Sequence, residues 1–289
     1  MSNLVESLSN SKTPNVPNWC PGCGDFGIWS AFKLAAQKKG WDSSNSAIVA
    51  GIGCHGHMVN FVQITAFEGL HGRSLPVASG IKMANNNLNV FSFSGDGDSL
   101  AEGGNHFVHT ARRNHDITLI LHDNAVYGLT TGQTSPRSPK GYVSKSTPAG
   151  SVEEPLNPLT MAIASGATFV AREYAGNIEQ ISELLIAANE HRGFSLVVIL
   201  QPCVTFNHMY THYFFQKNTY YLDKTHDITN KLHALEKSME WDLNKIPLGI
   251  FYKVESPSYE DQIPVLQSGA LGMRNIEVRN ISDLYKGFA

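Results

Sequence analysis

Residues 89–133 read NVFSFSGDGDSLAEGGNHFVHTARRNHDITLILHDNAVYGLTTGQ, and this stretch decides the fold of the chain. Residues 90–94 are apolar or small and run into a Gly-Asp-Gly turn, which is typical of a strand that ends in a tight loop. Residues 100–114 are long enough for a crossover helix, and residues 117–121 form a β-branched, apolar run typical of a buried strand. Strand-helix-strand units are nearly always right-handed and parallel, so both strands should end at the same edge of one sheet.

Two polar residues follow these strands at the predicted edge of the sheet. Asp96 comes directly after the first strand and Asn124 follows the second, so both should face one crevice. Carboxylate and amide oxygens are ligands that Mg²⁺ prefers, and a helix beginning near Ser99 would point free N–H groups at a bound anion. The pattern indicates a site for Mg²⁺ and a diphosphate, although an ordinary Asp-Gly turn followed by a chance Asn would read the same way.

The composition is that of a globular protein. The chain has 289 residues, of which 42% are hydrophobic, enough for one large α/β domain or two small ones. The formal charge of −3 argues against a dedicated nucleic-acid binder. No run of roughly 18 apolar residues occurs. The first residues lack the basic and apolar regions of a signal peptide, so we expect a cytoplasmic chain that does not enter a membrane.

Strands and helices alternate along the chain. We expect further strands at residues 47–51, 167–171 and 196–200, and further helices at residues 26–40, 76–87, 157–165 and 177–190. This alternation predicts a doubly wound, mainly parallel α/β sheet. Asp25 is placed to cap the helix at residues 26–40. Residues 134–158 form a loop rich in Ser, Pro and Gly that is too long for a plain connection, and we expect a lid or partner-binding segment.

Three regions are predicted from these patterns. Residues 1–18 are polar and contain two prolines, which indicates an extended N-terminal arm. Residues 19–207 should form the α/β domain that carries the site. Residues 208–289 begin with a segment rich in Tyr and Phe, and we expect an irregular C-terminal tail that packs on the domain or on a partner subunit.

A glycine-rich loop follows the strand at residues 47–51. Residues 51–56 read GIGCHG, which matches the G-x-G-x-x-G pattern of dinucleotide-binding loops. The acidic residue expected about 20 positions further on is missing, because no Asp or Glu lies between Glu68 and Asp96. We therefore favour another use of the glycines, in which the backbone approaches a different cofactor and Cys54 points to a metal centre.

The chain has four cysteines, and three of them lie in loops near the predicted carboxyl edge of the sheet. They are Cys20, Cys23, Cys54 and Cys203. In a cytosolic chain such cysteines are more often metal ligands or inert thiols than disulfides. Four thiolates suit a [4Fe–4S] cluster and suit a structural zinc equally, so the spacing alone leaves the metal open.

Gly-Asp-Gly followed by Asn resembles the motif of thiamine-diphosphate enzymes. More narrowly, GDGDS, GGNHFVHTARRN, DNAVYGLT and the CPGCG loop resemble the β subunits of 2-oxoacid:ferredoxin oxidoreductases, and the tail is similar to that of the 2-oxoglutarate type. The resemblance runs from about Trp19 to Asn207. It implies the thiamine-diphosphate-binding fold, with thiamine diphosphate, Mg²⁺ and one [4Fe–4S] cluster as cofactors.

The resemblance also implies roles for individual residues. The four cysteines would bind the cluster. Asp96, Asn124 and the backbone oxygen of Val126 would hold Mg²⁺. Cofactor contacts are implied for Ile52, Gly53, Cys54, His55, His71, Gly97, Asp98, Gly128 and Leu129, with Arg73 nearby. His55, Thr130 and Thr131 would lie beside the substrate. Several family members carry Lys or Gly where this chain has Thr131, which leaves the identity of the 2-oxoacid open.

The implied reaction is the oxidative decarboxylation of a 2-oxoacid to acyl-coenzyme A, with electrons passing to ferredoxin. No glutamate of this chain lies in a motif for activating thiamine, and in the family that carboxylate comes from an α subunit, which we therefore expect as a partner. Three alternatives stay open at this point. They are a pyruvate-specific member of the family, a non-redox thiamine-diphosphate decarboxylase, and a zinc-stabilised binding module without catalysis.

Overall fold

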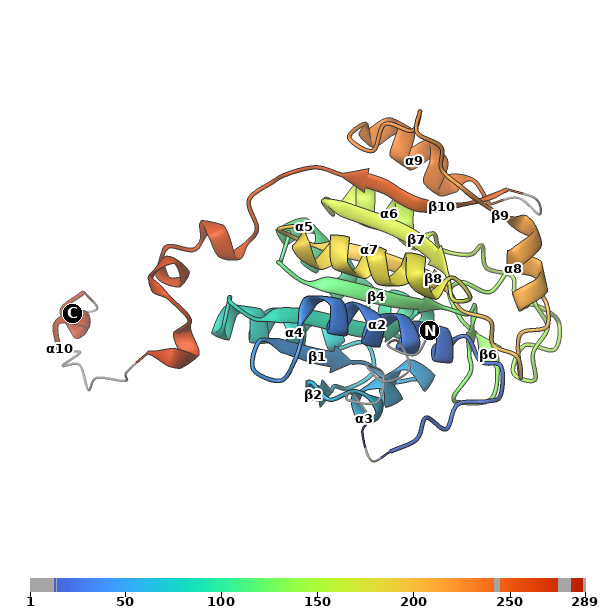
Figure 1. Ribbon diagram of the computed structural model, residues 1–289, viewed down its shortest axis with the longest axis horizontal. Coiled ribbons are helices and arrows are strands. Elements are labelled where there is room, and N and C mark those ends of the chain that lie inside the picture. Colours follow the sequence, from blue (N-terminus) through green and yellow to red (C-terminus); the bar gives the residue numbers. More distant parts are fainter. Residues whose placement is uncertain (1–12, 14, 242–244, 275–281, 288–289) are drawn as a thin grey trace.

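A large sheet runs through the centre of this computed structural model, which describes residue 13 and residues 15–241, 245–274 and 282–287 (Figure 1). Its strands are β1 (Ser46–Ala50), β2 (Thr65–Glu68), β3 (Asn89–Gly95), β4 (Thr118–Asp123), β7 (Phe169–Tyr174), β8 (Ser195–Leu200), β9 (Thr219–Tyr221) and β10 (Ile246–Lys253). Within the described residues they form one eight-stranded sheet in the order β2-β1-β3-β4-β8-β7-β10-β9. A short hairpin of β5 (Val126–Tyr127) and β6 (Gln133–Thr134) stands apart.

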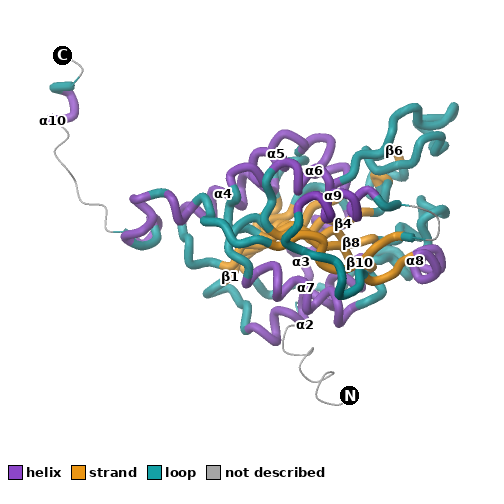
Figure 2. Tube along the Cα trace, turned by 90° about the horizontal axis from the view of Figure 1, so that it is seen from above, coloured by secondary structure: helices purple, strands orange, loops and turns teal. Residues whose placement is uncertain are grey.

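Helices cover both faces of this sheet, as Figure 2 shows. One layer holds α2 (Asp25–Lys39), α3 (Met58–Phe61) and α7 (Ile178–Glu190), and the other holds α4 (Ser74–Ala84), α5 (Gly104–Arg113), α6 (Pro158–Ser165) and α9 (Lys231–Met239). Phe32 and Leu185 pack with the strands on the first face, and Phe107 and Leu159 pack on the second. The helix α8 (His212–Asn218) lies near the end of the sheet that carries β9.

The predicted fold class is confirmed. Each neighbouring pair among β2, β1, β3, β4, β8 and β7 is parallel, and β10 runs antiparallel to β7. The central unit is a parallel pair of β3 and β4, as the sequence predicts. Its helix differs in one respect, because a wide π-helical turn at Asp98–Glu102 precedes α5, whereas the sequence predicts a continuous helix from residue 100.

The first turns of α6 and α2 differ in whether a side chain caps the helix. The Asn157 side chain accepts hydrogen bonds from the N–H groups of Leu159 (3.1 Å) and Thr160 (3.2 Å), and so caps α6. The predicted cap at α2 is wrong. Gly24 occupies the capping position there without a side-chain hydrogen bond, and the fully buried carboxylate of Asp25 points into the protein.

The C-terminal region is more regular than its sequence predicts. Between residues 208 and 253 it forms α8, β9, α9 and β10, and β10 extends the sheet by pairing with β7. The following segment packs at the amino edge of the sheet, where Glu260 accepts a hydrogen bond from the Asp116 N–H (3.0 Å). The helix α10 (Ser282–Tyr285) lies away from the sheet in both views (Figures 1 and 2). The division at residues 18 and 207 remains a prediction, and residues 1–12 and 14 of the predicted arm lie outside the described residues.

No helix in the described part of the chain is long and apolar enough to cross a membrane.

Candidate functional site

The loops at the carboxyl edge of the sheet enclose two neighbouring cavities. The smaller, of about 90 Å³, is lined by Ile52, Gly53, Cys54, His55, His71, Gly95, Asp96, Gly97, Asp98, Asn124, Val126, Tyr127, Gly128, Leu129 and Thr130. We call it the cofactor cavity. The larger, of about 300 Å³, is lined by Cys20, Cys23, Cys54, Cys203 and residues of the same loops, Thr131 among them. We call it the cysteine cavity. Four residues line both: Cys54, Asn124, Gly128 and Leu129.

Every residue that the sequence places at a site therefore lies at one of these two cavities, apart from Arg73. The predicted cofactor and Mg²⁺ residues line the cofactor cavity, and the four cysteines line the cysteine cavity. Arg73 is exposed, and its guanidinium donates to the backbone oxygen of Glu102 (2.7 Å). The roles of all these residues remain predictions.

Asp98 links three of the loops that form the cofactor cavity. Its buried carboxylate accepts hydrogen bonds from the N–H groups of Ile52 (3.1 Å) and Gly72 (2.7 Å) and from the Ser94 hydroxyl. Burial alone would raise the pKa of Asp98, but hydrogen bonding and the charge of nearby His55 outweigh it and hold the pKa below its ordinary value. The carboxylate is thus satisfied by the protein itself, and its side chain fixes the loops.

The surroundings of Asp96, unlike those of Asp98, disfavour the charged carboxylate. Its carboxylate is buried and accepts a hydrogen bond from the Ser135 hydroxyl. Burial and the nearby negative charge of Asp123 raise the pKa of Asp96 to about 7, although the Ser135 hydrogen bond and Arg137 oppose this. A carboxylate whose charge the protein disfavours, at the wall of a cavity, suits a hard cation, so Asp96 fits the predicted Mg²⁺.

Asn124 presents its amide between the two cavities. Its Oδ1 accepts from the Val126 N–H (3.0 Å), and its Nδ2 donates to Oε1 of Gln201 (2.9 Å). The next residue, Ala125, has φ 57°, and its carbonyl accepts from the Ser138 hydroxyl (2.6 Å). These contacts hold the loop after β4 in one conformation, which leaves the second lone pair of Oδ1 for a cation.

The glycines of the GIGCHG loop allow close packing against site residues. A Cβ on Gly51 would lie 1.7 Å from Asp98 Oδ2, and one on Gly53 would lie 2.5 Å from Cε1 of His55. The Nε2 atom of His55 accepts a hydrogen bond from the Gly95 N–H (3.1 Å), which places the ring proton of a neutral His55 on Nδ1. The glycine pattern is explained by these contacts without a dinucleotide.

The four sulfurs lie within electrostatic range of one another. A Cβ on Gly128 would lie 3.5 Å from Sγ of Cys203 and 3.8 Å from Sγ of Cys54. Burial raises the pKa of Cys54 to about 12, and the neighbouring charges of Asp25, Cys203 and Cys20 add to the effect. Among the described residues, no three His, Cys, Asp or Glu side chains form a group that could hold a metal ion. Four thiols that line one cavity have the donor type of a sulfur-bound cluster and of a zinc site, so the metal remains a prediction.

A buried polar network beneath the cysteine cavity was not predicted. Asp25 Oδ1 pairs with Nδ1 of His122 (2.7 Å), and Asp25 Oδ2 accepts from the Cys23 thiol (3.3 Å) and from Nε2 of Gln201 (3.3 Å). Burial lowers the pKa of His122. The contacts join residues up to 176 positions apart, so no local pattern reveals them; the signal available is that Gln201 directly precedes a Pro-Cys pair at a strand end.

The predicted lid is attached to both Asp96 and Asp123. Arg137 is buried and donates from Nε to Asp123 Oδ2 (2.9 Å) and from Nη1 to the Leu156 oxygen (2.7 Å). Further along the same segment, the Tyr142 hydroxyl donates to the backbone oxygen of Phe206 (2.7 Å), a residue that lines the cysteine cavity. Residues 135–142 therefore lie against the site, and the function of residues 134–158 as a lid remains a prediction.

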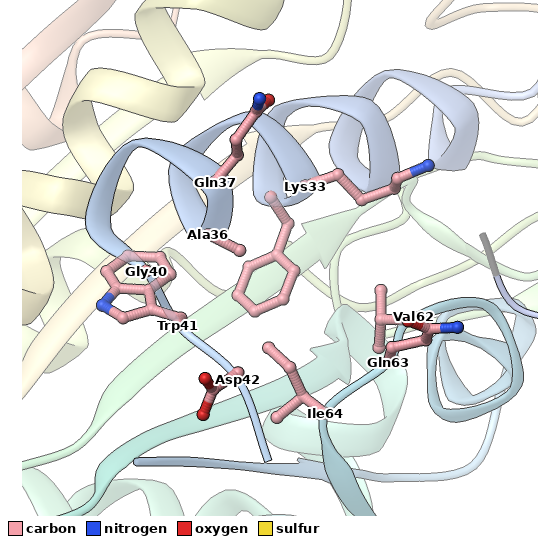
Figure 3. Close-up of a pocket in the computed structure, with 10 residues that line it drawn as sticks. Lys33, Ala36, Gln37, Gly40, Trp41, Asp42, Val62, Gln63 and Ile64 are labelled. Atoms are coloured by element: carbon pink, nitrogen blue, oxygen red, sulfur yellow. The ribbon is translucent and has the colours of Figure 1, made fainter. Parts of the chain in front are cut away.

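A third cavity, of about 320 Å³, lies between α2 and the loop that precedes β2 (Figure 3). Trp41, Val62 and Ile64, labelled in Figure 3, contribute apolar side chains to its wall, and Phe32 also lines it. No residue of the cofactor or cysteine cavity lines it.

Comparison with known proteins gives a consistent picture. Residues 51–199 match the thiamine pyrophosphate enzyme C-terminal TPP-binding domain, and residues 203–268 match the C-terminal region of the pyruvate ferredoxin oxidoreductase β subunits. The chain is 43% identical over 265 residues to a 2-oxoacid:ferredoxin oxidoreductase subunit β of Sulfolobus sp, with 87% of each chain covered. It is 42% identical over 201 residues to a 2-oxoglutarate synthase subunit KorB of Archaeoglobus fulgidus, covering 70% of this chain and 74% of that one.

The fold is also similar to that of a solved relative. A 2-oxoglutarate:ferredoxin oxidoreductase from Magnetococcus marinus superimposes with a TM-score of 0.89 at 35% identity, covering 98% of this chain and 95% of that one. The family models, the relatives in sequence and the solved structure all point to the same protein family. The chain belongs to the β subunits of the 2-oxoacid:ferredoxin oxidoreductases.

Proposed function

We propose that this chain is the thiamine-diphosphate and [4Fe–4S] subunit of a 2-oxoglutarate:ferredoxin oxidoreductase. One turnover would convert a 2-oxoacid, coenzyme A and two oxidised ferredoxins into acyl-coenzyme A, CO₂, two reduced ferredoxins and one proton. The carbon–carbon bond to the carboxylate breaks, and the acyl group forms a thioester. Each ferredoxin takes one of the two electrons released.

The observation that carries this proposal is the common wall of the two cavities. Thiamine diphosphate, when bound, supplies the carbanion that attacks the keto carbon. Cys54 and Gly128 line both cavities, so a cofactor in one lies beside a cluster in the other. Such proximity serves the transfer of electrons from substrate to cluster, and a non-redox decarboxylase has no use for it.

Within the cofactor cavity, residues of this chain divide between binding and orientation. Asp96 and Asn124 would hold Mg²⁺ and through it the diphosphate, while Asp98 fixes the loops around them. His55 is buried and lies at the cavity wall, where it would face the substrate.

Apolar side chains around the cofactor cavity favour a partner subunit. Ile52 and Leu129 line the cavity and are 36% and 48% exposed, and Phe67 and Leu70 on the neighbouring edge are 53% and 79% exposed. Exposed apolar groups gathered at a polar site are typical of an interface. An α subunit placed here would supply the missing activating carboxylate and exclude water.

The 2-oxoglutarate preference rests on the relatives. The Magnetococcus marinus enzyme is described with 2-oxoglutarate, coenzyme A and succinyl-coenzyme A bound, and the Archaeoglobus fulgidus relative is a 2-oxoglutarate synthase subunit. The test is anaerobic co-expression with the α subunit and assay of ferredoxin reduction. We expect reduction with 2-oxoglutarate that requires coenzyme A. Faster turnover with pyruvate would overturn the substrate assignment, and CO₂ release without ferredoxin reduction would overturn the redox function.

A further inference from the structure

The side chain of Gln201, which lines the cysteine cavity, contacts one residue of each cavity. It lies directly after β8, is 2% exposed, and donates through its own N–H to the Asp123 oxygen (2.9 Å). Its Oε1 accepts from Nδ2 of Asn124 (2.9 Å), and its Nε2 donates to Sγ of Cys23 (3.2 Å). One amide thus contacts a predicted Mg²⁺ ligand with one end and a predicted cluster ligand with the other.

The orientation of this amide follows from a fixed backbone donor. The Val126 N–H points at Oδ1 of Asn124 (3.0 Å), so the Nδ2 side of Asn124 must face Gln201. Because Nδ2 of Asn124 is a donor, the Gln201 atom that faces it must be the acceptor Oε1. The other end of the Gln201 amide, Nε2, then faces Cys23 and Asp25. The second proton of Nε2 is taken by Oδ2 of Asp25 (3.3 Å), so every part of the amide has a partner.

Packing holds the amide in this place. A Cβ on Gly24 would lie 2.8 Å from Cγ of Gln201, so the final glycine of the CPGCG loop makes room for this side chain. The Gly24 N–H in turn donates to the Pro202 oxygen (3.1 Å), which ties the loop to the end of β8. Asp25 is anchored from behind by His122, and both of these side chains are buried.

We propose that Gln201 is a positioning residue that acts on both centres of this enzyme. Through Nε2 it donates an N–H···S hydrogen bond to the Cys23 sulfur, which stabilises the reduced, more negative cluster and raises its reduction potential. Through Oε1 it accepts from Nδ2 of Asn124 and supports the orientation that the Val126 N–H sets, in which Oδ1 would face the Mg²⁺ position. This inference rests on the proposed function, because it needs the cluster and the Mg²⁺ to be bound.

The test uses the anaerobically purified complex with its partner subunit and compares wild type with Gln201→Leu. We expect the midpoint potential of the cluster, followed by EPR during a redox titration, to shift to more negative values in the variant. We expect the affinity for thiamine diphosphate at fixed Mg²⁺ to fall about 10- to 100-fold, the usual effect of losing a residue that supports a metal ligand. Asn218→Leu is the matched control, because Asn218 is a buried amide of α8 that lines neither cavity, and it should change neither quantity.

A measurement on the wild-type protein keeps the test decisive if Gln201→Leu fails to assemble. In a complex labelled with ¹⁵N at glutamine amides, pulsed EPR of the reduced cluster should show coupling to one side-chain ¹⁵N. Absence of that coupling, or a wild-type potential in Gln201→Leu, would overturn the role of Gln201. Absence of iron in the wild-type complex would instead overturn the proposed function, so the two failures are distinguishable.

Discussion

Asp96 and Asp98 are buried carboxylates two positions apart, and the protein treats them differently. Nearby His55, the Ser94 hydroxyl and the Gly72 N–H hold the pKa of Asp98 below its ordinary value. Burial and the carboxylate of Asp123 instead raise the pKa of Asp96 to about 7. The contrast assigns Asp98 to the structure of the loops and leaves Asp96 with a charge that a bound cation would balance.

Exchanging Asp96 for asparagine should therefore separate stability from cofactor binding. Because the pKa of Asp96 is raised from 3.8, the folded apo-protein loses stability from this group as pH rises from about 4 to about 7. Asp96→Asn removes that cost, so its unfolding free energy at pH 8 should exceed that of wild type by on the order of 1 kcal/mol. Retention of thiamine diphosphate with Mg²⁺ should be abolished.

Urea denaturation at several pH values and cofactor analysis after gel filtration check both results. Asp42→Asn, at an exposed carboxylate of the loop before β1, is the control and should retain the cofactor. Wild-type retention of thiamine diphosphate by Asp96→Asn would contradict the assignment of the Mg²⁺ site.

Thr131 is held in a conformation that suits glycine. Its φ is 81°, in the left-handed region where a β-branched residue is strained, typically by about 1–3 kcal/mol. Thr131→Gly should raise the unfolding free energy by about 1 kcal/mol, since greater freedom of the unfolded glycine offsets part of the relief. Thr130→Gly is the neighbouring control and should destabilise the protein, because Thr130 donates to Oε1 of Gln133 (2.6 Å). Equal losses in both variants, measured by urea denaturation, would contradict strain at Thr131.

At the scale of elements, the segment after β10 is attached through a buried contact between a carboxylate and a histidine at the amino edge of the sheet. The fully buried carboxylate of Glu260 lies 2.7 Å from Nδ1 of His115. Burial would raise the pKa of Glu260, but hydrogen bonds from His115 and from the Asp116 N–H hold it below its ordinary 4.5. Asn114 Nδ2 also donates to the Pro257 oxygen (3.1 Å), so several contacts fasten this segment.

Acid should weaken this attachment. A depressed carboxylate pKa contributes stability above about pH 4.5, and that stability is lost as pH falls through the lower folded value. Glu260→Gln should lower the unfolding free energy by about 1–3 kcal/mol at pH 7, through an unpaired buried group. The difference from wild type should shrink below pH 4.5, which urea denaturation across pH measures. A difference that is constant down to pH 3 would contradict the lowered pKa of Glu260.

The elements that sequence predicts well are those with strong patterns. β3, β4 and β8 are apolar runs bounded by glycine or polar residues, and each is fully or almost fully buried. β2 was not predicted because it is a four-residue edge strand whose residues are all exposed. β10 was missed because Pro247 and Gly249 interrupt it, and its place in the sheet depends on pairing with β7, far away in sequence.

Some residues of the candidate site can likewise be predicted from the sequence, and others cannot. Asp96, Asn124 and Cys203 follow strands, so topology alone predicts that they gather at one edge. Gln201 and Ser135 could not be found, because their partners lie 77 and 39 positions away and neither residue type signals a site by itself. Such contacts depend on the packing of loops, which a single sequence does not encode locally.

At the scale of the whole molecule, we propose that the chain supplies one part of an active site that a partner subunit completes. The apolar side chains near the cofactor cavity, Phe67 and Leu70 among them, are exposed in the monomer, and no glutamate lines that cavity within the described residues. We predict that the isolated chain binds cofactors but does not oxidise 2-oxoacids, and that adding the α subunit restores ferredoxin reduction. Robust oxidation by the isolated chain would contradict the need for a partner carboxylate.

The cofactor cavity and the cysteine cavity share one wall, and what occupies the cysteine cavity tests the proposed redox function most directly. The measurement is analysis of iron, acid-labile sulfide and zinc in the anaerobically purified protein, together with its visible spectrum. We predict about four irons and four sulfides per chain, with a broad brown absorbance. One zinc and no iron would contradict the redox function, because the thiamine cofactor would then have no neighbouring electron acceptor.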